Sequence, residues 1–193
     1  MIKIFQQRFK ESSDLLQSVI SDSKIQKTMQ EAVSGIVSCF RSGHKVMFCG
    51  NGGSAADAQH LAAELSGKFY IERQPLPAEA LHVNSSYITA VANDYTFDHI
   101  YSRYVSGAGK KDDVLIGLST SGNSENIIRA FRAAKENGIA TMGFTGKTGG
   151  KLETYSDLIV KIPSDDVPRI QEMHLLIGHI ICERVEHELF GKQ

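Results

Sequence analysis

Two segments far apart in the chain carry acid/base or metal-binding side chains where a hydrophobic pattern would place plain core residues. His60 and Glu64 stand four residues apart, so on a helix their imidazole and carboxylate share one face and can converge on one proton, ligand or metal. Gln171, His174 and His179 interrupt a second, largely apolar segment near the C-terminus. Burying a polar group without a partner is costly, so a histidine in so apolar a run indicates a partner or a chemical task.

Two loops rich in small and hydroxyl residues form a second group of candidates. The first, residues 49–55, contains three glycines, which let the backbone approach a ligand closely, and Asn51 and Ser54 offer hydrogen bonds. The second, residues 119–126, gathers four hydroxyls directly after an apolar run. Placed before a helix, such a loop can surround a phosphate with no Lys or Arg of its own.

Each signal also has a purely structural interpretation. A His and a Glu four residues apart are common on helix surfaces, and a histidine such as His174 on an apolar helix is usually satisfied within the core. Asn93 and Asp94 fit a helix stop and turn, and the hydroxyl loop fits a helix cap. Residues 50–55 formally match a relaxed dinucleotide fingerprint. The strand that follows ends in His-Val-Asn, without the acid that would hold a ribose, so this interpretation is disfavoured.

The elements that position these groups alternate between short apolar runs and helical stretches. This alternation predicts βαβ units and a parallel sheet, and the first forty residues predict two helices. We therefore expect one α/β domain over residues 1–193, with a helical extension over about residues 1–42 packed on it. Strands are expected at 46–49, 80–83, 114–118, 141–144 and 158–162, and further helices near 55–66, 86–92, 124–137 and 167–189.

Composition excludes several functional classes. A net charge of -1, with acids and bases interspersed, leaves no electrostatic footprint for nucleic acid or an anionic membrane. Cys39, Cys49 and Cys182 lie in apolar segments without Cys-x-x-Cys spacing, which favours free thiols in a reducing cytoplasm. No apolar run reaches ~18 residues, and the N-terminus lacks the pattern of a signal peptide. We expect a cytoplasmic protein that binds neither nucleic acid nor membranes.

The last helix is apolar around its whole circumference. One small sheet covers only one side of a helix, so we expect other subunits to cover the rest, together with the apolar stripe of residues 25–40. The sequence therefore predicts an obligate homo-oligomer. One stripe of the last helix consists of Ile170, Met173, Ile177, Ile181 and Val185, while Leu175, Leu176, Ile180 and Cys182 cover much of the remaining surface.

Five segments, in order along the chain, resemble the phosphoheptose isomerases of the sugar isomerase (SIS) domain superfamily. The match covers nearly the whole chain, and the joint presence of all five is far more specific than any single motif. The segments are residues 49–65, Ala-Asn-Asp at 92–94, Leu-Ser-Thr-Ser-Gly-Asn-Ser-Glu-Asn at 118–126, Thr-Gly-Lys-Thr-Gly-Gly-Lys at 145–151, and Arg-Ile-Gln-Glu-Met-His at 169–174.

The resemblance implies a fold, an assembly and a reaction. The fold is a flavodoxin-like α/β SIS domain, with a five-stranded parallel sheet flanked by helices and two N-terminal helices. The assembly is a homotetramer with active sites at subunit interfaces. The reaction converts sedoheptulose 7-phosphate to D-glycero-D-manno-heptose 7-phosphate, the first step toward ADP- or GDP-heptose for lipopolysaccharide or other surface glycans.

The resemblance also implies roles for single residues. Glu64 and His179 would be the acid/base pair, and a reacting centre of His60, Glu64, Gln171 and His179 would hold one zinc ion per subunit, as described in some family members. Moving a carbonyl from C2 to C1 removes a proton from C1 and returns one to C2 through an enediol, for which one carboxylate and one imidazole suffice. Ser119, Thr120, Ser121 and Ser124 would cradle the phosphate, and Asn51, Gly52, Gly53, Ser54, Glu64, Asn93, Asp94 and Gln171 would contact the rest of the substrate.

Two questions stay open at the level of sequence. Gln171 and His179 lie eight residues apart, about 12 Å along one helix, so both reach one metal only if they lean together or belong to different subunits. The SIS scaffold also serves non-enzymatic sugar-phosphate sensors and adaptors, including relatives that bind the replication initiator, and isomerases of ketose phosphates of other lengths. An adaptor has no need for Glu64 and His179 together, and their joint presence favours the isomerase.

Overall fold

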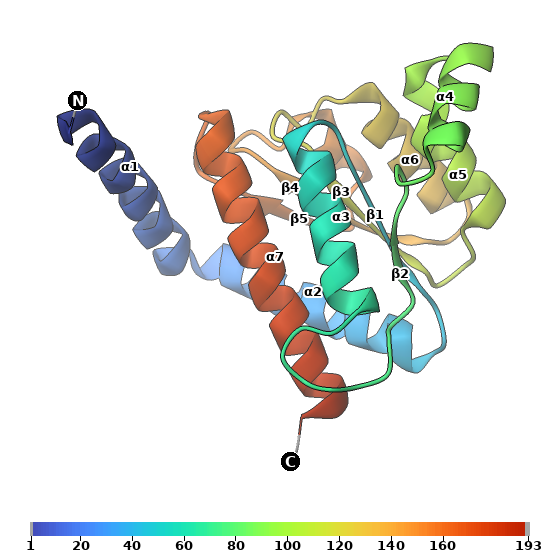
Figure 1. Ribbon diagram of the computed structural model, residues 1–193, viewed down its shortest axis with the longest axis horizontal. Helices are drawn as coiled ribbons and strands as arrows, with labels where there is room; N and C mark the ends of the chain where they lie inside the picture. The colour runs from blue at the N-terminus through green and yellow to red at the C-terminus, as the bar shows by residue number, and fades with distance from the viewer. Residues whose placement is uncertain (1, 192–193) are drawn as a thin grey trace.

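The structure, a computed structural model, describes residues 2–191. Its sheet has five strands in the order β2-β1-β3-β4-β5, and every neighbouring pair is parallel (Figure 1). Five parallel strands flanked by helices confirm the predicted fold class. The strands are β1 (Val46–Gly50), β2 (Ala78–Ala80), β3 (Val114–Leu118), β4 (Ala140–Thr145) and β5 (Leu158–Lys161).

Helices cover both faces of the sheet. Helices α2 (Ser23–Arg41), α3 (Gly53–Ser66) and α7 (Val167–Phe190) pack on one face. The other face carries the remaining helices of the α/β unit. These are α4 (Ser85–Asp94), α5 (Ile100–Ala108) and α6 (Glu125–Glu136), with the short 3₁₀ helices η1 (Phe97–His99) and η2 (Gly150–Tyr155).

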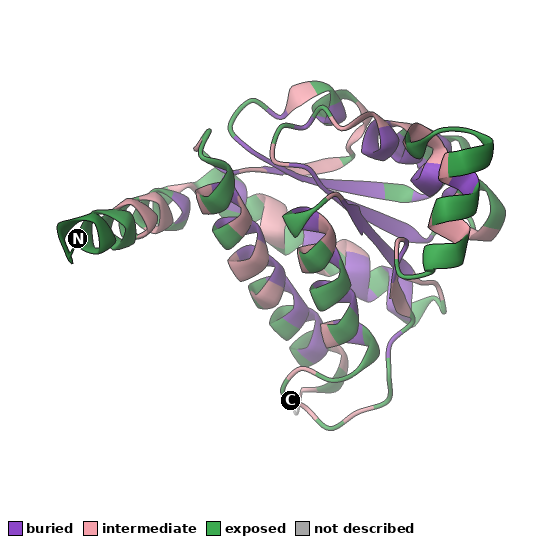
Figure 2. Cartoon of the chain, turned by 45° about the horizontal axis from the view of Figure 1, so that its top comes forward, coloured by how far each residue is buried: buried purple, intermediate pink, exposed green. Residues whose placement is uncertain are grey.

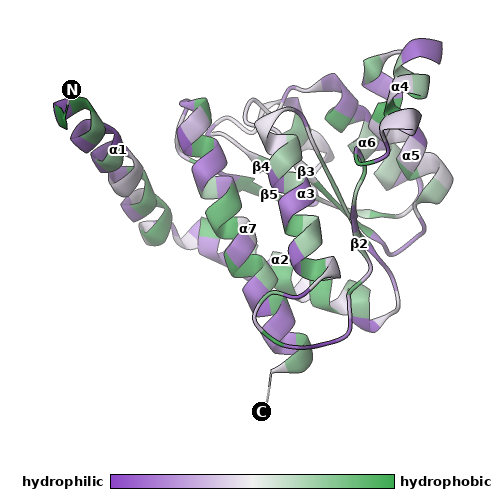
Figure 3. Ribbon diagram, in the orientation of Figure 1, coloured by the Kyte–Doolittle hydropathy of each residue, from purple (hydrophilic) through white to green (hydrophobic). Residues whose placement is uncertain are grey.

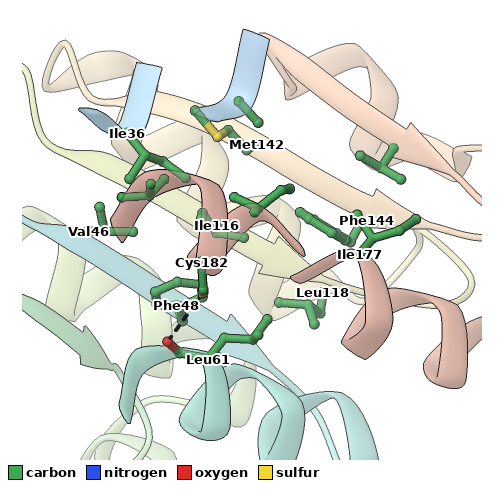
Figure 4. Close-up of a cluster of buried hydrophobic side chains, with 14 of the residues drawn as sticks. Ile36, Val46, Phe48, Leu61, Ile116, Leu118, Met142, Phe144, Ile177 and Cys182 are labelled. Atoms are coloured by element: carbon green, nitrogen blue, oxygen red, sulfur yellow. Dashed lines mark hydrogen bonds between the residues drawn. The ribbon is translucent and has the colours of Figure 1, made fainter. Parts of the chain in front are cut away.

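The central strands are buried on both sides, which explains their continuous apolar sequences. In β1, Phe48 faces α3 and α7, whereas Met47 faces the opposite helices. Figure 4 shows the first of these clusters, in which Phe48 lies beside Leu61 of α3 and Cys182 of α7. This packing fixes α3 and α7 side by side over the same face of the sheet.

The second strand and the fifth helix differ from the sequence-based prediction. We expected a strand over 80–83, but β2 ends at Ala80 because Asn84 already caps α4, accepting a hydrogen bond from the amide of Tyr87 at 3.1 Å. Helix α5 was not predicted. It buries only Ile100, Tyr101 and Val105, which are too few positions to show a helical period in the sequence.

The two N-terminal helices behave differently. Helix α2 begins at a cap in which Asp22 accepts hydrogen bonds from the amides of Lys24 and Ile25 at 2.9 and 3.2 Å, and it contributes to the main core. Helix α1 (Ile2–Ser21) projects from the body of the molecule, with most of its residues exposed (Figure 2). Phe5 and Phe9 are among its exposed apolar side chains.

Some apolar residues of α7 are buried within the chain, and others remain at the surface. The stripe that includes Ile170 and Ile177 is buried against the sheet and α3, while Ile180 is 40% exposed and Leu176 is half-buried. Apolar residues thus remain on the outer surfaces of α1 and α7 (Figure 3). No helix of residues 2–191 is long and apolar enough to cross a membrane.

Candidate active site

The strand order reverses between β1 and β3, and the loops that follow these two strands lead to helices on opposite faces of the sheet. The loop after β1 enters α3, and the loop after β3 enters α6. In open α/β sheets a crevice forms at this point, beyond the carboxyl ends of the strands, and ligands bind there. Both loops singled out in the sequence therefore meet at one edge of the sheet.

The loop after β1 is shaped by its glycines and by a tyrosine beneath it. Gly52 has a φ of +56°, a conformation that favours glycine, and it immediately precedes the first turn of α3. The buried hydroxyl of Tyr101 donates a hydrogen bond to the carbonyl of Gly50 at 2.5 Å. Asn51 is thereby held at the carboxyl edge of the sheet.

A reciprocal amide pair joins the two loops. The side-chain amide of Asn51 donates to the side-chain oxygen of Asn126 at 2.9 Å, and that of Asn126 donates back at 2.8 Å. Asn126 is buried in the first turn of α6. Asn126 was not predicted to have a role, since a polar residue in the first turn of a helix carries no signal of its partner.

The loop after β3 has the features of an anion site. The hydroxyls of Ser119 and Ser124 lie 3.1 Å apart, so Ser124 does not cap the amides of α6 although it is the N-cap residue. The positive end of the α6 dipole therefore faces the loop. Gly122, with a φ of +64°, packs against Gly149 so closely that a Cβ would overlap its carbonyl. The segment after β4 thus buttresses this loop.

Three predicted site residues converge between α3 and α7. The Nε2 atom of His60 lies 2.8 Å from Nε2 of His179 and 3.1 Å from Oε1 of Glu64. These ligand atoms all lie within 4.8 Å of one another, and the His60 side chain is 49% exposed. We call His60, Glu64 and His179 the His-Glu-His cluster. Two imidazole nitrogens and a carboxylate oxygen are donors that Zn²⁺ accepts, so the cluster fits such an ion.

Close helix packing makes this convergence possible. Gly178 lies directly against Leu61, and a Cβ added to it would be 2.5 Å from Leu61 Cδ1. Any other residue at 178 would require the Leu61 side chain to shift or the two helices to move apart. Gly178 was not predicted to have a role, because its neighbour on α3 is 117 positions away in the chain.

The side chain of Gln171 contacts the start of α3. Its side-chain amide nitrogen is 3.5 Å from Ser54 Oγ, and its side chain fills the space beside Gly53, at the start of α3. The structure thus brings together three of the four predicted metal ligands and places Gln171 beside the loop after β1. His60 is seven residues beyond Gly53, about 10 Å along α3, so the site extends from that loop to the cluster.

The remaining predicted substrate contacts lie on the other face of the sheet. Asn93 and Asp94 end α4, which packs on η1 and α5, and the Asn93 side chain donates to Asp94 Oδ1 at 3.0 Å. Both residues are exposed.

Two further titratable groups lie on α7 and α3, the helices that carry the cluster. His174 is fully buried, and burial lowers its pKa to about 4, so it is neutral at neutral pH with Nε2 placed 3.1 Å from the carbonyl of Thr145. This supports the structural interpretation of His174. Asp57, one turn before His60 on α3, was not singled out by sequence. Burial raises the pKa of Asp57 above its usual value, although nearby His60 and His179 oppose this shift.

Comparison with known proteins identifies the family to which this chain is similar. Residues 8–146 match the family model described as the SIS domain. A phosphoheptose isomerase of Clostridium acetobutylicum is 48% identical over 193 residues, covering 100% of this chain and 98% of that protein. One from Rhodospirillum rubrum is 55% identical over 82% of this chain and 85% of that protein. The solved phosphoheptose isomerase of Francisella tularensis superposes with a TM-score of 0.92 at 35% identity, covering 96% and 98% of the two chains.

Proposed function

Since the chain belongs to the phosphoheptose isomerases of the SIS-domain family, we propose that it interconverts sedoheptulose 7-phosphate and D-glycero-D-manno-heptose 7-phosphate. This aldose-ketose isomerisation begins the synthesis of nucleotide-activated heptose. The observation that carries the proposal is the convergence of Glu64 and His179 beside His60, because an acid/base pair at one point is what proton transfer through an enediol requires.

In the proposed mechanism, one end of the site binds the phosphate and the other end carries out the proton transfer. The hydroxyls and backbone of residues 119–124, at the N-terminus of α6, bind the phosphate. The sugar chain then extends along α3 toward the His-Glu-His cluster, where its C1 and C2 lie. Glu64 accepts the proton from C1 to give the enediol, and His179 donates a proton to C2, while a proton passes from the C1 hydroxyl to the C2 oxygen. Proton exchange with solvent then restores both side chains. Gln171 and residues 51–54 orient the sugar between these two ends.

We further propose that His60, Glu64 and His179 hold one zinc ion per subunit. A bound zinc ion would polarise the substrate carbonyl and stabilise negative charge on the enediol oxygens. Gln171 would complete the ligand set only by turning away from Ser54. The Nε2 atom of His179 cannot hold a metal and carry a proton at the same time, so its two roles belong to different states of the cycle.

The assembly that we propose is a homotetramer with active sites at subunit interfaces. A groove of about 840 Å³ lies between α2 and α7, and its apolar lining includes Met29, Val33, Leu176 and Ile180. A second copy of the chain would cover this groove and the projecting helix α1. The exposed side of the His-Glu-His cluster would then face a neighbouring copy. Asn93 and Asp94 at the end of α4 are proposed to contact the sugar.

We also propose a cellular compartment and a domain organisation for the chain. All three cysteines are buried and free, which suits a reducing cytoplasm, where the sugar-phosphate substrate would be found. The helical extension over about residues 1–42 would act with the rest of the chain as one SIS domain.

Incubation of the purified protein with sedoheptulose 7-phosphate tests the proposed reaction. The sample is first treated with chelator, and the ratio of aldose to ketose is followed by NMR with and without added zinc. We expect the aldose heptose 7-phosphate to accumulate to equilibrium, faster with zinc. Absence of turnover under both conditions would reject the isomerase and favour a non-enzymatic SIS protein.

A further inference from the structure

A buried ion pair fastens the end of α3 to α7, below the His-Glu-His cluster. Arg73 lies in the loop after α3 and Glu186 lies near the end of α7, and their side chains are each 1% exposed. The Nε atom of Arg73 donates to Glu186 Oε1 at 2.8 Å. Removing two charges from water is expensive, and such a pair is weak evidence for stability on its own. Its other hydrogen bonds indicate what it holds in place.

The guanidinium of Arg73 caps the C-terminus of α3. It donates to the carbonyl of Glu64 at 3.0 Å through Nη2, and to those of Leu65 and Gly67 at 3.0 and 3.1 Å through Nη1. These carbonyls lie at the end of the helix, where the negative end of the dipole favours a cation. The cation therefore binds the backbone of Glu64, whose carboxylate belongs to the His-Glu-His cluster.

Glu186 fixes the loop that follows. Its carboxylate accepts hydrogen bonds from the amides of Phe69, Tyr70 and Ile71 at 2.9, 2.7 and 2.9 Å. Burial alone would raise the pKa of Glu186, but these amides and Arg73 lower it below its usual value, so the group is ionised at neutral pH. The anchored loop places the ring of Phe69 with its centroid 5.8 Å from that of the His179 imidazole.

The ion pair of Arg73 and Glu186 is thus connected to both Glu64 and His179. It reaches Glu64 through the backbone of the last turn of α3. It reaches His179 through Phe69 and through α7 itself, because Glu186 lies seven residues after His179, about two turns along the same helix face. The phosphate loop, by contrast, lies near the other end of α3 and makes its own contacts with the segment after β4.

We propose that Arg73 and Glu186 are positioning residues that hold the carboxylate of Glu64 against the imidazole of His179 for proton transfer. This inference rests on the proposed function and deepens it. Neither residue touches the reacting atoms. Misplacing a catalytic group by about 1 Å can cost about 10²-fold in rate, so the pair acts on the chemical step and leaves phosphate binding nearly unchanged.

Kinetics of Arg73→Lys and Glu186→Gln test the proposal. Lysine keeps the charge but cannot reach Glu186 and several carbonyls together, and glutamine keeps the shape but removes the charge. We expect kcat to fall about 10- to 100-fold in each variant, with KM for the sugar phosphate changed less than about threefold. Glu31→Gln is the matched control. It removes the same charge from an exposed pair with Lys27 on α2 and should leave both constants unchanged.

The outcomes separate the positioning role from the proposed function. No turnover by the wild type rejects the isomerase. An active wild type with unaffected kcat in Arg73→Lys rejects the positioning role, as does an equal loss of inorganic phosphate binding and turnover. If Glu186→Gln does not fold, Arg73→Lys carries the test. A further measurement needs no substrate. The imidazole NMR signals of His179 should shift in Arg73→Lys and stay unchanged in Glu31→Gln, and unshifted signals in both variants would contradict the proposal.

Discussion

Substituting Gly178 by alanine tests whether the close approach of α3 and α7 builds the His-Glu-His cluster. The added Cβ would lie 2.5 Å from Leu61 Cδ1 and 2.6 Å from Leu61 Cδ2. Carbon atoms in good contact are separated by about 3.5–4.0 Å, so the shortfall is about 1 Å. Leu61 is buried beneath Cys182 in the main core (Figure 4). Because Leu61 is buried and has little room to shift, we expect part of the strain to displace α7 from α3 at the residue next to His179.

The size of the effect follows from two opposing contributions. Overpacking a buried site costs about 1–3 kcal/mol of unfolding free energy, and replacing glycine by alanine within a helix offsets about 1 kcal/mol of that cost. We therefore expect a net loss of about 0–2 kcal/mol. A shift of about 1 Å between His60 and His179 should lower kcat about 10- to 100-fold.

The assay combines denaturant unfolding with turnover of sedoheptulose 7-phosphate. Gly107→Ala serves as the control, because a Cβ at Gly107 in α5 meets no atom within 4 Å. That variant should keep wild-type turnover and be equally or more stable. Wild-type turnover together with undiminished stability in Gly178→Ala would refute the idea that this glycine sets the distance between the two histidines.

Four further substitutions examine other parts of the account. Glu64→Gln keeps the shape of the side chain but removes the base, so turnover should fall about 10²- to 10⁴-fold while assembly and phosphate binding persist; near-normal turnover would remove Glu64 from the mechanism. His179→Asn should slow the reaction comparably and weaken zinc binding, and unchanged zinc content by metal analysis would show that His179 is not a ligand. Asn126→Ala removes the partner of the loop after β1, so KM for the sugar phosphate should rise about tenfold, and an unchanged KM would argue against the bridge between the loops. Ile180→Asp places a charge on the outer face of α7, which a lone chain tolerates but a buried interface does not; light scattering should show dissociation with loss of activity, and an intact tetramer would place the interface elsewhere.

Sequence patterns predicted the parts of the fold that local signals determine. The buried strands β1 and β3 have continuous apolar runs, and the spacing of His60 and Glu64 already placed them on one helix face. Strand β2 is only three residues long, and its register with β1 is a tertiary feature, so its predicted position was wrong by two residues at its start. The sequence left the position of Gln171 relative to His179 open, and in the structure the Gln171 side chain lies beside Ser54.

The rest of the site depends on partners distant in the chain. Asn126 pairs with Asn51, Gly178 packs on Leu61, and Arg73 binds both Glu186 and the end of α3. In the sequence, a glycine within a helix indicates only a slightly lower helix propensity, and an arginine in a loop is typical of the protein surface. Their roles appear only when α3 and α7 are placed side by side.

The measurement that tests the central claim most directly is solvent exchange during turnover. Sedoheptulose 7-phosphate is incubated in D₂O with the wild type and, at equal concentration, with Glu64→Gln, and deuterium is located by NMR. If Glu64 and His179 move a proton through an enediol, the wild type should place solvent deuterium at C2 of the aldose and at C1 of the recovered ketose, and Glu64→Gln should do neither at a comparable rate. Full turnover by the wild type with no deuterium at either carbon would contradict proton transfer by this cluster.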